Sequence, residues 1–343
     1  MFSNPLVWTS LAEEISPFLK YCYGIVLNAG SGQRSIQLGE KDLNIDITEY
    51  NKPDIIADLH QIPLLDESVD TIVSIAVLEH TRYPWQIAKE FYRVLRPMGY
   101  GVIAVPFLQP QHDFPGDYIR FTENGLIEIF KYAGFEIIET SHVHHFGQTL
   151  AWLLWEYLQF HPPRKFTWFF WQNLIRQLSL GNILKGDSPN THNTHYIVVR
   201  KLGDITIKPY YMEALANKDN KDWFFSLLAC PITKQSLYLQ ENSLVSEDGK
   251  FIYGFQDSIP YLEASENVIS SPQINSNQSQ LEESEPKLLS QLSEELTRLR
   301  ARAKNIELEL ENSKNRIAMI ESSKFWKLRN SWFKLKSALN LAK

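Results

Sequence analysis

Short apolar runs alternate with helical segments through residues 22–140, and this alternation limits the fold more than any other feature of the chain. Each run has the length of a strand and is hydrophobic almost throughout, as expected for strands buried on both faces of a sheet. The runs are GIVLN (24–28), LNID (43–46), DIIA (54–57), DTIVSI (70–75), YGVIAVPF (100–107), FEIIET (135–140) and HYIVVR (195–200). Strands that alternate with helices predict an α/β fold with a doubly wound, mostly parallel sheet.

Two helices are predicted between these runs. The first begins at Pro84 and is ended by Pro97 and Gly99. The second follows Thr122 and ends at Gly134, because a threonine suits a helix N-cap and a glycine suits the residue after a helix. Its apolar face has the spacing i, i+3, i+4, i+7 and consists of Leu126, Ile129, Phe130 and Ala133.

The first apolar run leads into a glycine turn, GIVLNAGSGQ. Gly30 and Gly32 have no side chains, so a ligand can lie close to the backbone over the end of the strand. The second run ends at Asp46, whose carboxylate can accept hydrogen bonds from both hydroxyls of a ribose. Ser35 stands where a dinucleotide fingerprint needs a third glycine, which disfavours NAD, and the absence of Gly-Lys-Ser/Thr excludes a Walker loop.

Three further motifs follow in a fixed order: Asp58 after the third run, Leu78-Glu79-His80 after the fourth, and RVLRPMGYG before the fifth. Together with the glycine turn they closely resemble the class I S-adenosylmethionine-dependent methyltransferases of the small-molecule type. The resemblance covers residues 20–145 and the run at 195–200. It implies a Rossmann-like sheet of seven strands, with the last strand inserted antiparallel, and S-adenosyl-L-methionine as the cofactor of an enzyme that transfers methyl groups.

The same resemblance implies which residues bind the cofactor. The two glycines of the turn would line its methionine and ribose, Asp46 would bind the ribose hydroxyls, and Asp58 with the backbone of Leu59 would read the adenine amino group. The segment from Ala76 to Leu78 would form the floor of the cofactor pocket. Asn28 replaces the usual aspartate of the first strand, leaving an amide to orient the loop and the amino end of the cofactor. The implied contacts are Asn28, Gly30, Gly32, Asp46, Asp58, Leu59, Ala76 and Leu78. The short distance from the turn to the second strand predicts a truncated first helix.

Candidate catalytic residues lie just beyond the fifth run, in PFLQPQHDFPGDYIRFT. A hydroxyl acceptor needs a base near neutral pH, and His112 would take its proton. Asp113 or Asp117 would orient that imidazole, and Arg120 would hold an anionic part of the acceptor. The alternative interpretation is a rigid proline-rich loop whose polar residues bond to its own backbone, with Asp117 and Arg120 as a local pair. No metal site is predicted, because His142 and His144 lack a nearby carboxylate or thiolate and are better explained as a polar rim of the cleft.

The same string further resembles a methyltransferase subgroup found beside glycosyltransferases in surface-polysaccharide gene clusters. That resemblance favours a hydroxyl of a glycan or a related small metabolite as the acceptor. Two alternatives stay open. One is a cofactor-binding scaffold that docks glycan-assembly enzymes, and the other is a tRNA- or protein-modifying methyltransferase. The second is disfavoured by an acidic body and by the lack of an Asn-Pro-Pro-Tyr type motif.

The methyltransferase domain is predicted to span residues 1–205, with an aromatic-rich insertion at 146–193. Nine of the 26 residues in 151–176 are aromatic. The insertion is interpreted as a cap over the acceptor site, and helices lying in a bilayer interface are the alternative. Residues 221–262 resemble a small zinc-ribbon-like methyltransferase activator, but Cys230 is their only cysteine, so we predict that this segment holds no zinc.

The C-terminal part of the chain differs in composition from the rest. Residues 263–286 are rich in Ser, Asn, Gln and Glu, which predicts a disordered linker. In 287–343 eight of nine heptad positions are apolar, which predicts a coiled coil that makes the protein a homo-oligomer, followed by a basic aromatic tail. This region has a charge of +7 and the remaining residues −13, which argues against nucleic acid as the partner. With two cysteines and no signal peptide, a cytoplasmic protein is expected, with membrane or glycosyltransferase contact through the tail as an addition.

Overall fold

A computed structural model describes most of the first 263 residues: 4–7, 10–32, 37–49, 52–112, 116–164, 167–184, 191–205, 208–216 and 223–263. The chain divides into two units, 1–271 and 272–343, and every described residue belongs to the first. The predicted coiled coil and basic tail lie outside the described residues, as do Asp113 and the predicted linker apart from residue 263.

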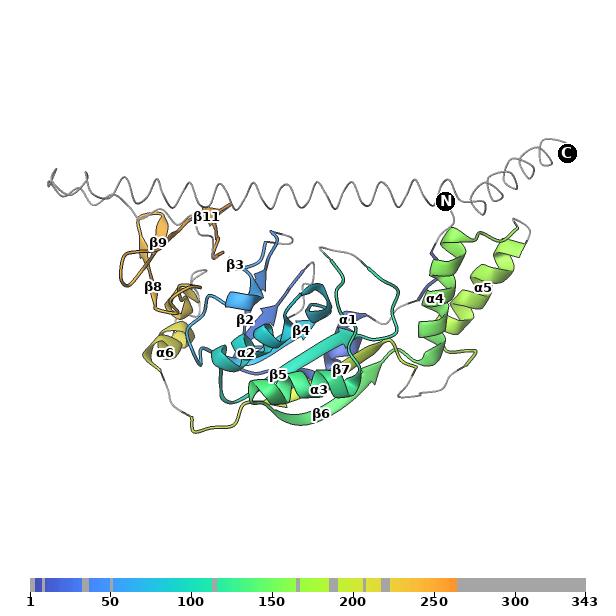
Figure 1. Ribbon diagram of the computed structural model, residues 1–343, viewed down its shortest axis with the longest axis horizontal. Coiled ribbons are helices and arrows are strands. Elements are labelled where there is room, and N and C mark those ends of the chain that lie inside the picture. Colours follow the sequence, from blue (N-terminus) through green and yellow to red (C-terminus); the bar gives the residue numbers. More distant parts are fainter. Residues whose placement is uncertain are drawn as a thin grey trace, which may run out of the picture. The chain divides into compact units, whose positions relative to one another are not determined.

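Seven strands form one sheet in the order β3-β2-β1-β4-β5-β7-β6 (Figure 1). Five of them are parallel neighbours: β1 (Ile25–Ala29), β2 (Lys41–Asp46), β3 (Ile55–Ile56), β4 (Val69–Ile75) and β5 (Leu95–Pro106). Strand β7 (Thr194–Arg200) lies between β5 and β6 (Glu136–Val143) and is antiparallel to both. The predicted doubly wound sheet with a late antiparallel insertion is therefore confirmed.

The sheet is covered on both faces. On one face α2 (Pro84–Val94) and α3 (Glu123–Ala133) bury Phe91 and Phe130 in the larger hydrophobic core. The predicted caps of α3 are confirmed, because the Thr122 hydroxyl accepts from the N–H of Gly125 and Gly134 adopts a left-handed conformation. On the other face α1 (Leu11–Ile15) and the 3-10 helix η1 (Ser16–Tyr21) form a second core, which includes the stacked rings of Phe18 and Tyr196.

Two connections fix the positions of the candidate site residues. Between β1 and β2 the described residues, 30–32 and 37–40, hold no helix, so the glycine turn leads back to the sheet along a short path. After β4, Ala76 has a positive φ of 53° and donates its N–H to the carbonyl of Ala104. The chain then enters the short 3-10 helix η3 (Leu78–His80) at the carboxyl end of the sheet.

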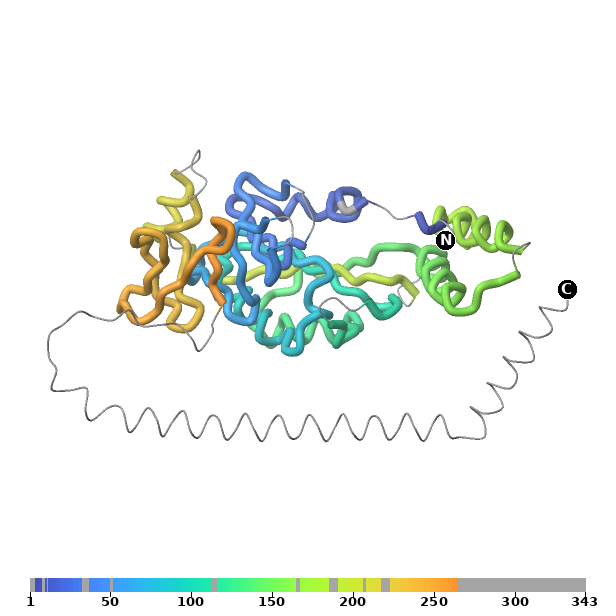
Figure 2. The backbone as a smooth tube through the Cα atoms, turned by 90° about the horizontal axis from the view of Figure 1, so that it is seen from above, coloured from blue at the N-terminus to red at the C-terminus, as the bar shows by residue number. Residues whose placement is uncertain are grey.

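The aromatic-rich insertion consists of two helices, α4 (Phe146–Phe160) and α5 (Trp168–Ser179), which lie side by side in both views (Figures 1 and 2). They share a small core that includes Trp155, Trp168 and Ile175. Phe160 and Phe169 point outward, each with 80% of its surface exposed. None of the described helices is long and apolar enough to cross a membrane.

Beyond β7 the chain forms a small β-rich unit that shares the core of the sheet. It consists of α6 (Pro209–Ala216), the 3-10 helix η5 (Phe225–Leu227), the antiparallel strands β8 (Leu237–Gln240), β9 (Ser243–Ser246) and β10 (Ile252–Tyr253), and the pair β11 (Phe255–Gln256) and β12 (Ile259–Pro260). Cys230 is fully buried, with Sγ 3.1 Å from the hydroxyl of Tyr253, and both residues belong to the larger core. The unit is thus packed as part of the first domain.

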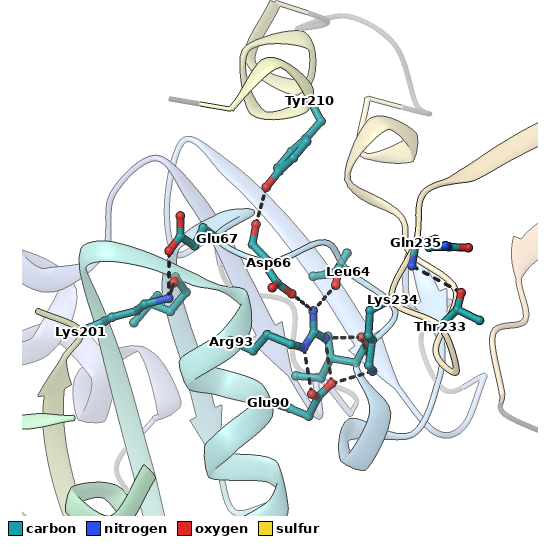
Figure 3. A network of polar contacts seen from close by, with 12 residues as sticks. Leu64, Asp66, Glu67, Glu90, Arg93, Lys201, Tyr210, Thr233, Lys234 and Gln235 are labelled. Carbon is teal, nitrogen blue, oxygen red and sulfur yellow. Dashed lines mark hydrogen bonds and ion pairs between the residues drawn. The ribbon is translucent and has the colours of Figure 1, made fainter. Parts of the chain in front are cut away.

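Figure 3 shows the polar contacts that hold this unit to the sheet. Arg93 of α2 donates to Glu90, to Asp66 and to the carbonyl of Leu64, and Lys234 of the small unit donates to the same Glu90 carboxylate at 2.9 Å. The two cations lower the pKa of Glu90 even though burial of the carboxyl opposes them. A half-buried network of this kind fixes the relative position of α2 and the segment that follows Cys230.

Candidate functional site

The glycine turn after β1 is shaped by a neighbouring side chain as well as by its backbone. Gly30 has φ +71° and donates its N–H to the carbonyl of Ile45 at 2.8 Å. A Cβ on Gly30 would lie 2.4 Å from Cγ2 of Val77, so a side chain there is excluded by both conformation and contact. Gly32 has φ +54°, and no atom of the described residues lies within 4 Å of the place where its Cβ would be. As far as the described residues show, the space over Gly32 is open to a ligand.

Asp46, at the end of β2, holds this turn together. Its side chain is 9% exposed, and Oδ2 accepts the N–H of Gly32 at 2.8 Å. Oδ1 accepts from the N–H and the hydroxyl of Thr48 at 2.9 and 2.8 Å. A carboxylate has about four acceptor positions, so these three bonds leave capacity for a ribose hydroxyl. The predicted role in cofactor binding is compatible with this geometry and stays a prediction.

The side-chain amide of Asn28 is committed to the next strand. Its NH₂ donates to Oδ1 of Asn44 at 2.9 Å, and Asn44 in turn donates to Asp54 at 3.0 Å. These bonds tie β1 to β2 below the turn, so the structure does not show the amide orienting the loop. The carbonyl oxygen of the Asn28 amide is the group that can accept from the amino end of the cofactor.

Asp58 caps the 3-10 helix η2 (Leu59–Gln61) that follows β3. Its Oδ1 accepts the N–H of His60 at 2.9 Å and lies 2.7 Å from Nδ1 of the same residue. Burial would raise the pKa of Asp58, but the bonds from His60 outweigh it and lower that pKa. Leu59 is 7% exposed, and its side chain belongs to the larger core. The predicted contacts of Asp58 and Leu59 with adenine stay predictions.

A cavity of about 460 Å³ opens at the carboxyl ends of β4 and β5. Its walls come from strand ends, from α4 and from the N-terminal segment, and include Ile75, Ala76, Pro106, Gln109, Trp152 and Glu156. Ala76 thus lines the cavity as the sequence predicts. The side chain of Leu78 is fully buried in the core and does not line it, so any contact of Leu78 with a ligand would be through its backbone.

The loop after β5 agrees in part with each of its two interpretations. Asp117 pairs with Arg120 through both carboxylate oxygens and accepts the backbone N–H of His112 at 3.0 Å. Its Oδ2 is 3.7 Å from Nδ1 of His112, too far for a hydrogen bond, so the structure does not show Asp117 orienting the imidazole. Arg120 also donates to the carbonyl of Pro110 at 3.2 Å. Asp117 and Arg120 are therefore seen as a local structural pair.

The ring of His112 is held by the backbone instead. Its Nδ1 lies 3.2 Å from the carbonyl oxygen of Pro110, and its ring centroid lies 6.4 Å from that of Trp152, which lines the cavity. The carboxylate of Glu79 raises the pKa of His112, although burial of the ring opposes this. His112 thus lies near a residue of the cavity wall but is not itself one of the lining residues, and its predicted catalytic role stays a prediction.

Glu79 and His80 have no role predicted from the sequence, and the structure brings both to His112. Glu79 is fully buried, and neither of its carboxylate oxygens has a hydrogen-bond partner within the described part of the chain. The Nε2 atoms of His80 and His112 lie 3.6 and 3.7 Å from its Oε1. The motif Leu78-Glu79-His80 was a usable signal, but its partner is more than thirty residues away, on the loop after the adjacent strand.

The other histidines singled out from the sequence serve different contacts. His144 lies between Asn193 and Glu14, with ring nitrogens 2.5 and 2.8 Å from their side-chain oxygens. His142 stacks on His192 with ring centroids 4.4 Å apart. His144 lines the cavity, in agreement with the predicted polar rim, and His142 belongs to a buried group of rings beside it.

Comparison with known proteins bears on the N-terminal half of this site. Residues 14–103 match the family model described as a methyltransferase domain. A curated protein of Mycolicibacterium smegmatis, a probable S-adenosylmethionine-dependent methyltransferase, is 33% identical over 138 residues, which are 38% of this chain and 53% of that protein. Residues 14–103 are therefore similar to methyltransferase domains, and S-adenosylmethionine is the cofactor named for the curated relative.

The matched segment includes the glycine turn, Asp46, Asp58, Glu79 and His80, and it ends before His112 and the helices that cover the cavity. The chain spans about half the length of the curated relative. The match therefore does not show that this chain has the activity of that protein.

Solved structures with a similar fold are remote from this chain. A putative methyltransferase from Bacillus halodurans is 13% identical, with coverage of 57% of this chain and 100% of that one and a TM-score of 0.39. The [4+2]-cyclase SpnF is 15% identical, with coverage of 59% and 86% and a TM-score of 0.37. Likenesses at this level carry no argument about activity or substrate.

Proposed function

We propose that the protein transfers the methyl group of S-adenosylmethionine to a small acceptor bound in the cavity at the ends of β4 and β5. One observation carries this proposal. The segment after β4 faces both sites, because Ala76 lines the cavity and the next residue, Val77, packs against Gly30 of the glycine turn. A cofactor bound over the turn and an acceptor in the cavity would meet across these two residues, at the sheet edge where α/β folds bind their ligands.

The reaction requires that the reacting atoms be positioned and that the hydroxyl proton of the acceptor be removed. S-adenosylmethionine supplies a methyl group on a positively charged sulfur. The acceptor oxygen forms a bond to that carbon while the carbon–sulfur bond breaks, and the hydroxyl proton must leave. Holding the reacting atoms in line supplies much of the rate. In a site without a metal ion, Nε2 of His112 would take the proton, because Nδ1 of this ring faces a carbonyl oxygen that can only accept.

The cavity walls favour a sugar hydroxyl as the acceptor. Trp152 and Trp155 supply aromatic surface, and Gln109 and Glu156 supply hydrogen-bonding groups beside it. Rings next to a few polar groups are the usual means of binding a compound that has both apolar faces and hydroxyls. This wall comes from α4, which supports the interpretation of the aromatic insertion as a cap. We therefore propose a glycan or a related metabolite as the substrate, within surface-polysaccharide synthesis.

Cofactor binding is tested by calorimetry on the full chain, with Asp46→Asn and Thr48→Val as a matched pair. Asp46→Asn removes the charge that would receive the ribose hydroxyls, and we expect the affinity for S-adenosylmethionine to fall about tenfold to a hundredfold. Thr48→Val removes one bond to Asp46 but leaves the carboxylate, so a change of less than about threefold is expected. Equal losses would mean that Asp46 acts only through the shape of the turn. Absence of saturable binding by the wild type would end the proposal.

The acceptor is tested with radiolabelled cofactor and fractionated cell-envelope precursors. Trp152→Ala is expected to raise the KM for the acceptor while the affinity for S-adenosylmethionine stays near that of the wild type, because this ring lines the cavity away from the glycine turn. Phe169→Ala, a change of an exposed ring on α5, is the control and is expected to leave both constants unchanged. Incorporation into protein or tRNA instead of a glycan fraction would contradict the proposed substrate.

A further inference from the structure

Three side chains with metal-binding groups converge beside the cavity. Glu79 and His80 belong to η3, after β4, and His112 belongs to the loop after β5. One nitrogen from each histidine and one oxygen of Glu79 all lie within 4.8 Å of one another. Tetrahedral ligands at about 2.1 Å from an ion would be about 3.4 Å apart. The observed separations from Oε1, 3.6 Å to His80 and 3.7 Å to His112, are close to that value.

The carboxylate of Glu79 lacks the partners that a buried charge requires. Its side chain is fully buried, and within the residues that the structure describes neither oxygen accepts a hydrogen bond. A carboxylate in this environment is unfavourable unless it is paired or coordinates a metal ion. If a proton joined Glu79 to His112, their atoms would be expected about 2.7–2.9 Å apart rather than at 3.7 Å. The space between the three groups is therefore wider than an ion pair needs.

Both histidines are oriented with the same nitrogen toward that space. Nδ1 of His80 lies 2.6 Å from the carbonyl oxygen of Gly116, and Nδ1 of His112 lies 3.2 Å from that of Pro110. A carbonyl oxygen only accepts, so these contacts favour the neutral tautomer with the proton on Nδ1 and the lone pair on Nε2. For His112 they compete with a longer contact of 3.5 Å from Arg120 to Nδ1. Metal-binding histidines are commonly fixed in this way, by donation of the second ring nitrogen to a backbone carbonyl.

We propose that Glu79, His80 and His112 bind one divalent transition-metal ion. Two imidazoles and one carboxylate suit Zn²⁺, Mn²⁺ or Fe²⁺ better than Mg²⁺ or Ca²⁺, which prefer oxygen ligands. Three protein ligands leave a position open, as in catalytic metal sites. This proposal departs from the sequence-based prediction that the chain binds no metal.

The place of the site gives the ion a role that rests on the proposed function. His112 is next to Trp152 in the wall of the cavity, so the open position would be reached from the acceptor side. An acceptor oxygen bound there would lose its proton more easily. In this case Nε2 of His112 is a ligand and does not act as the base. Binding of the ion itself does not depend on methyl transfer.

The first test uses the full chain freed of metal with a chelator. Co²⁺ is added while visible absorption is recorded, and Zn²⁺ binding is measured by calorimetry. One ion per chain is expected. Glu79→Gln, His80→Asn and His112→Asn should each weaken Zn²⁺ binding by more than about a hundredfold, because even the loss of an outer-sphere partner costs ten- to a hundredfold. His142→Asn, a change in the separate group of stacked rings, is the matched control and should bind Zn²⁺ as the wild type does.

Affinity for S-adenosylmethionine, measured on the same preparations, separates the outcomes. The three ligand variants should keep it within about threefold, which shows that they are folded. Cofactor binding without metal binding, or equal metal binding by all variants, would overturn this inference and leave the proposed function standing. Metal binding without cofactor binding would overturn the proposed function and leave this inference standing. If both bind, turnover should be lost on chelation and restored by Mn²⁺ or Zn²⁺.

Discussion

Asp46 and Asp58, in one half of the sheet's carboxyl edge, differ from Glu79, in the other half, in how their carboxylates are satisfied. In the half formed by β1, β2 and β3, Asp46 and Asp58 each accept hydrogen bonds from residues of their own loops. In the half formed by β4 and β5, Glu79 is more deeply buried and has no such bond among the described residues. The first half is complete without a ligand. Within the described residues, the second half leaves the Glu79 carboxylate without a hydrogen-bond partner.

This difference separates two ways of building a binding edge. Where the chain satisfies its own carboxylates, the loop keeps its shape and a ligand adds to spare acceptor positions. Where a carboxylate is left unpaired, the fold loses stability until something binds, which is typical of functional sites. Mutations of the glycines of the turn should therefore act mainly on stability, whereas removal of Glu79 should make the protein more stable and less able to bind a metal ion.

The largest effect is expected at the glycine turn. Gly30→Ala places a Cβ 2.4 Å from Val77 at a φ of +71°, and we expect it to lower the free energy of unfolding by about 2–4 kcal/mol. Gly32→Ala meets no atom within 4 Å and carries only the conformational penalty, about 1 kcal/mol. Urea denaturation of both variants measures the difference. Equal losses would show that Val77 moves aside and that the turn is not held by this contact.

Glu79→Met tests the other half. Replacing a buried, unpaired carboxylate by an apolar side chain of similar size should raise the free energy of unfolding by about 1–3 kcal/mol in metal-free buffer, while Zn²⁺ binding is lost. Glu90→Met is the matched control, because Glu90 is paired with Arg93 and Lys234. That change should lower stability by about 1–3 kcal/mol, since it leaves two cations without their partner. A loss of stability in both variants would contradict the contrast between paired and unpaired carboxylates.

The sequence predicted the first half of this edge better than the second. Gly30, Gly32 and Asp46 follow directly from strand ends and local spacing, and the caps of α3 follow from Thr122 and its glycine stop. Such features depend on residues near one another in the chain. The matched domain also covers them, and the predicted antiparallel insertion of the last strand is observed.

The rest depends on contacts that spacing does not contain. Glu79 and His112 meet only because β4 and β5 are adjacent, and whether a carboxylate has partners is decided by packing. The pairing of Asp117 with Arg120 is one of two interpretations of the loop, and no residue pattern distinguishes them before the structure is known. Likewise, the burial of Cys230 in the core of the sheet follows from long-range packing rather than from the composition of residues 221–262.

The smallest expected effect concerns pH and the buried rings next to the cavity. Burial first, and then repulsion from His192 and His142, lowers the pKa of His195 to about 4 from an ordinary value near 6.5. Between about pH 6.5 and 4 the unfolded chain therefore binds a proton at His195 that the folded chain does not bind. The contribution of His195 to the free energy of unfolding is fully present above about pH 6.5 and is lost as the pH drops toward 4. The loss should reach about 2 kcal/mol, shared with the two neighbouring histidines. Because wild-type stability also falls through carboxylate protonation, the measurement is the difference from His195→Asn, which keeps a group near Nδ1 but does not titrate.

The difference should appear between pH 6.5 and 4, and the exposed His161→Asn should follow the wild type. Parallel curves for His195→Asn and the wild type would mean that the pKa of His195 is not lowered in the folded protein.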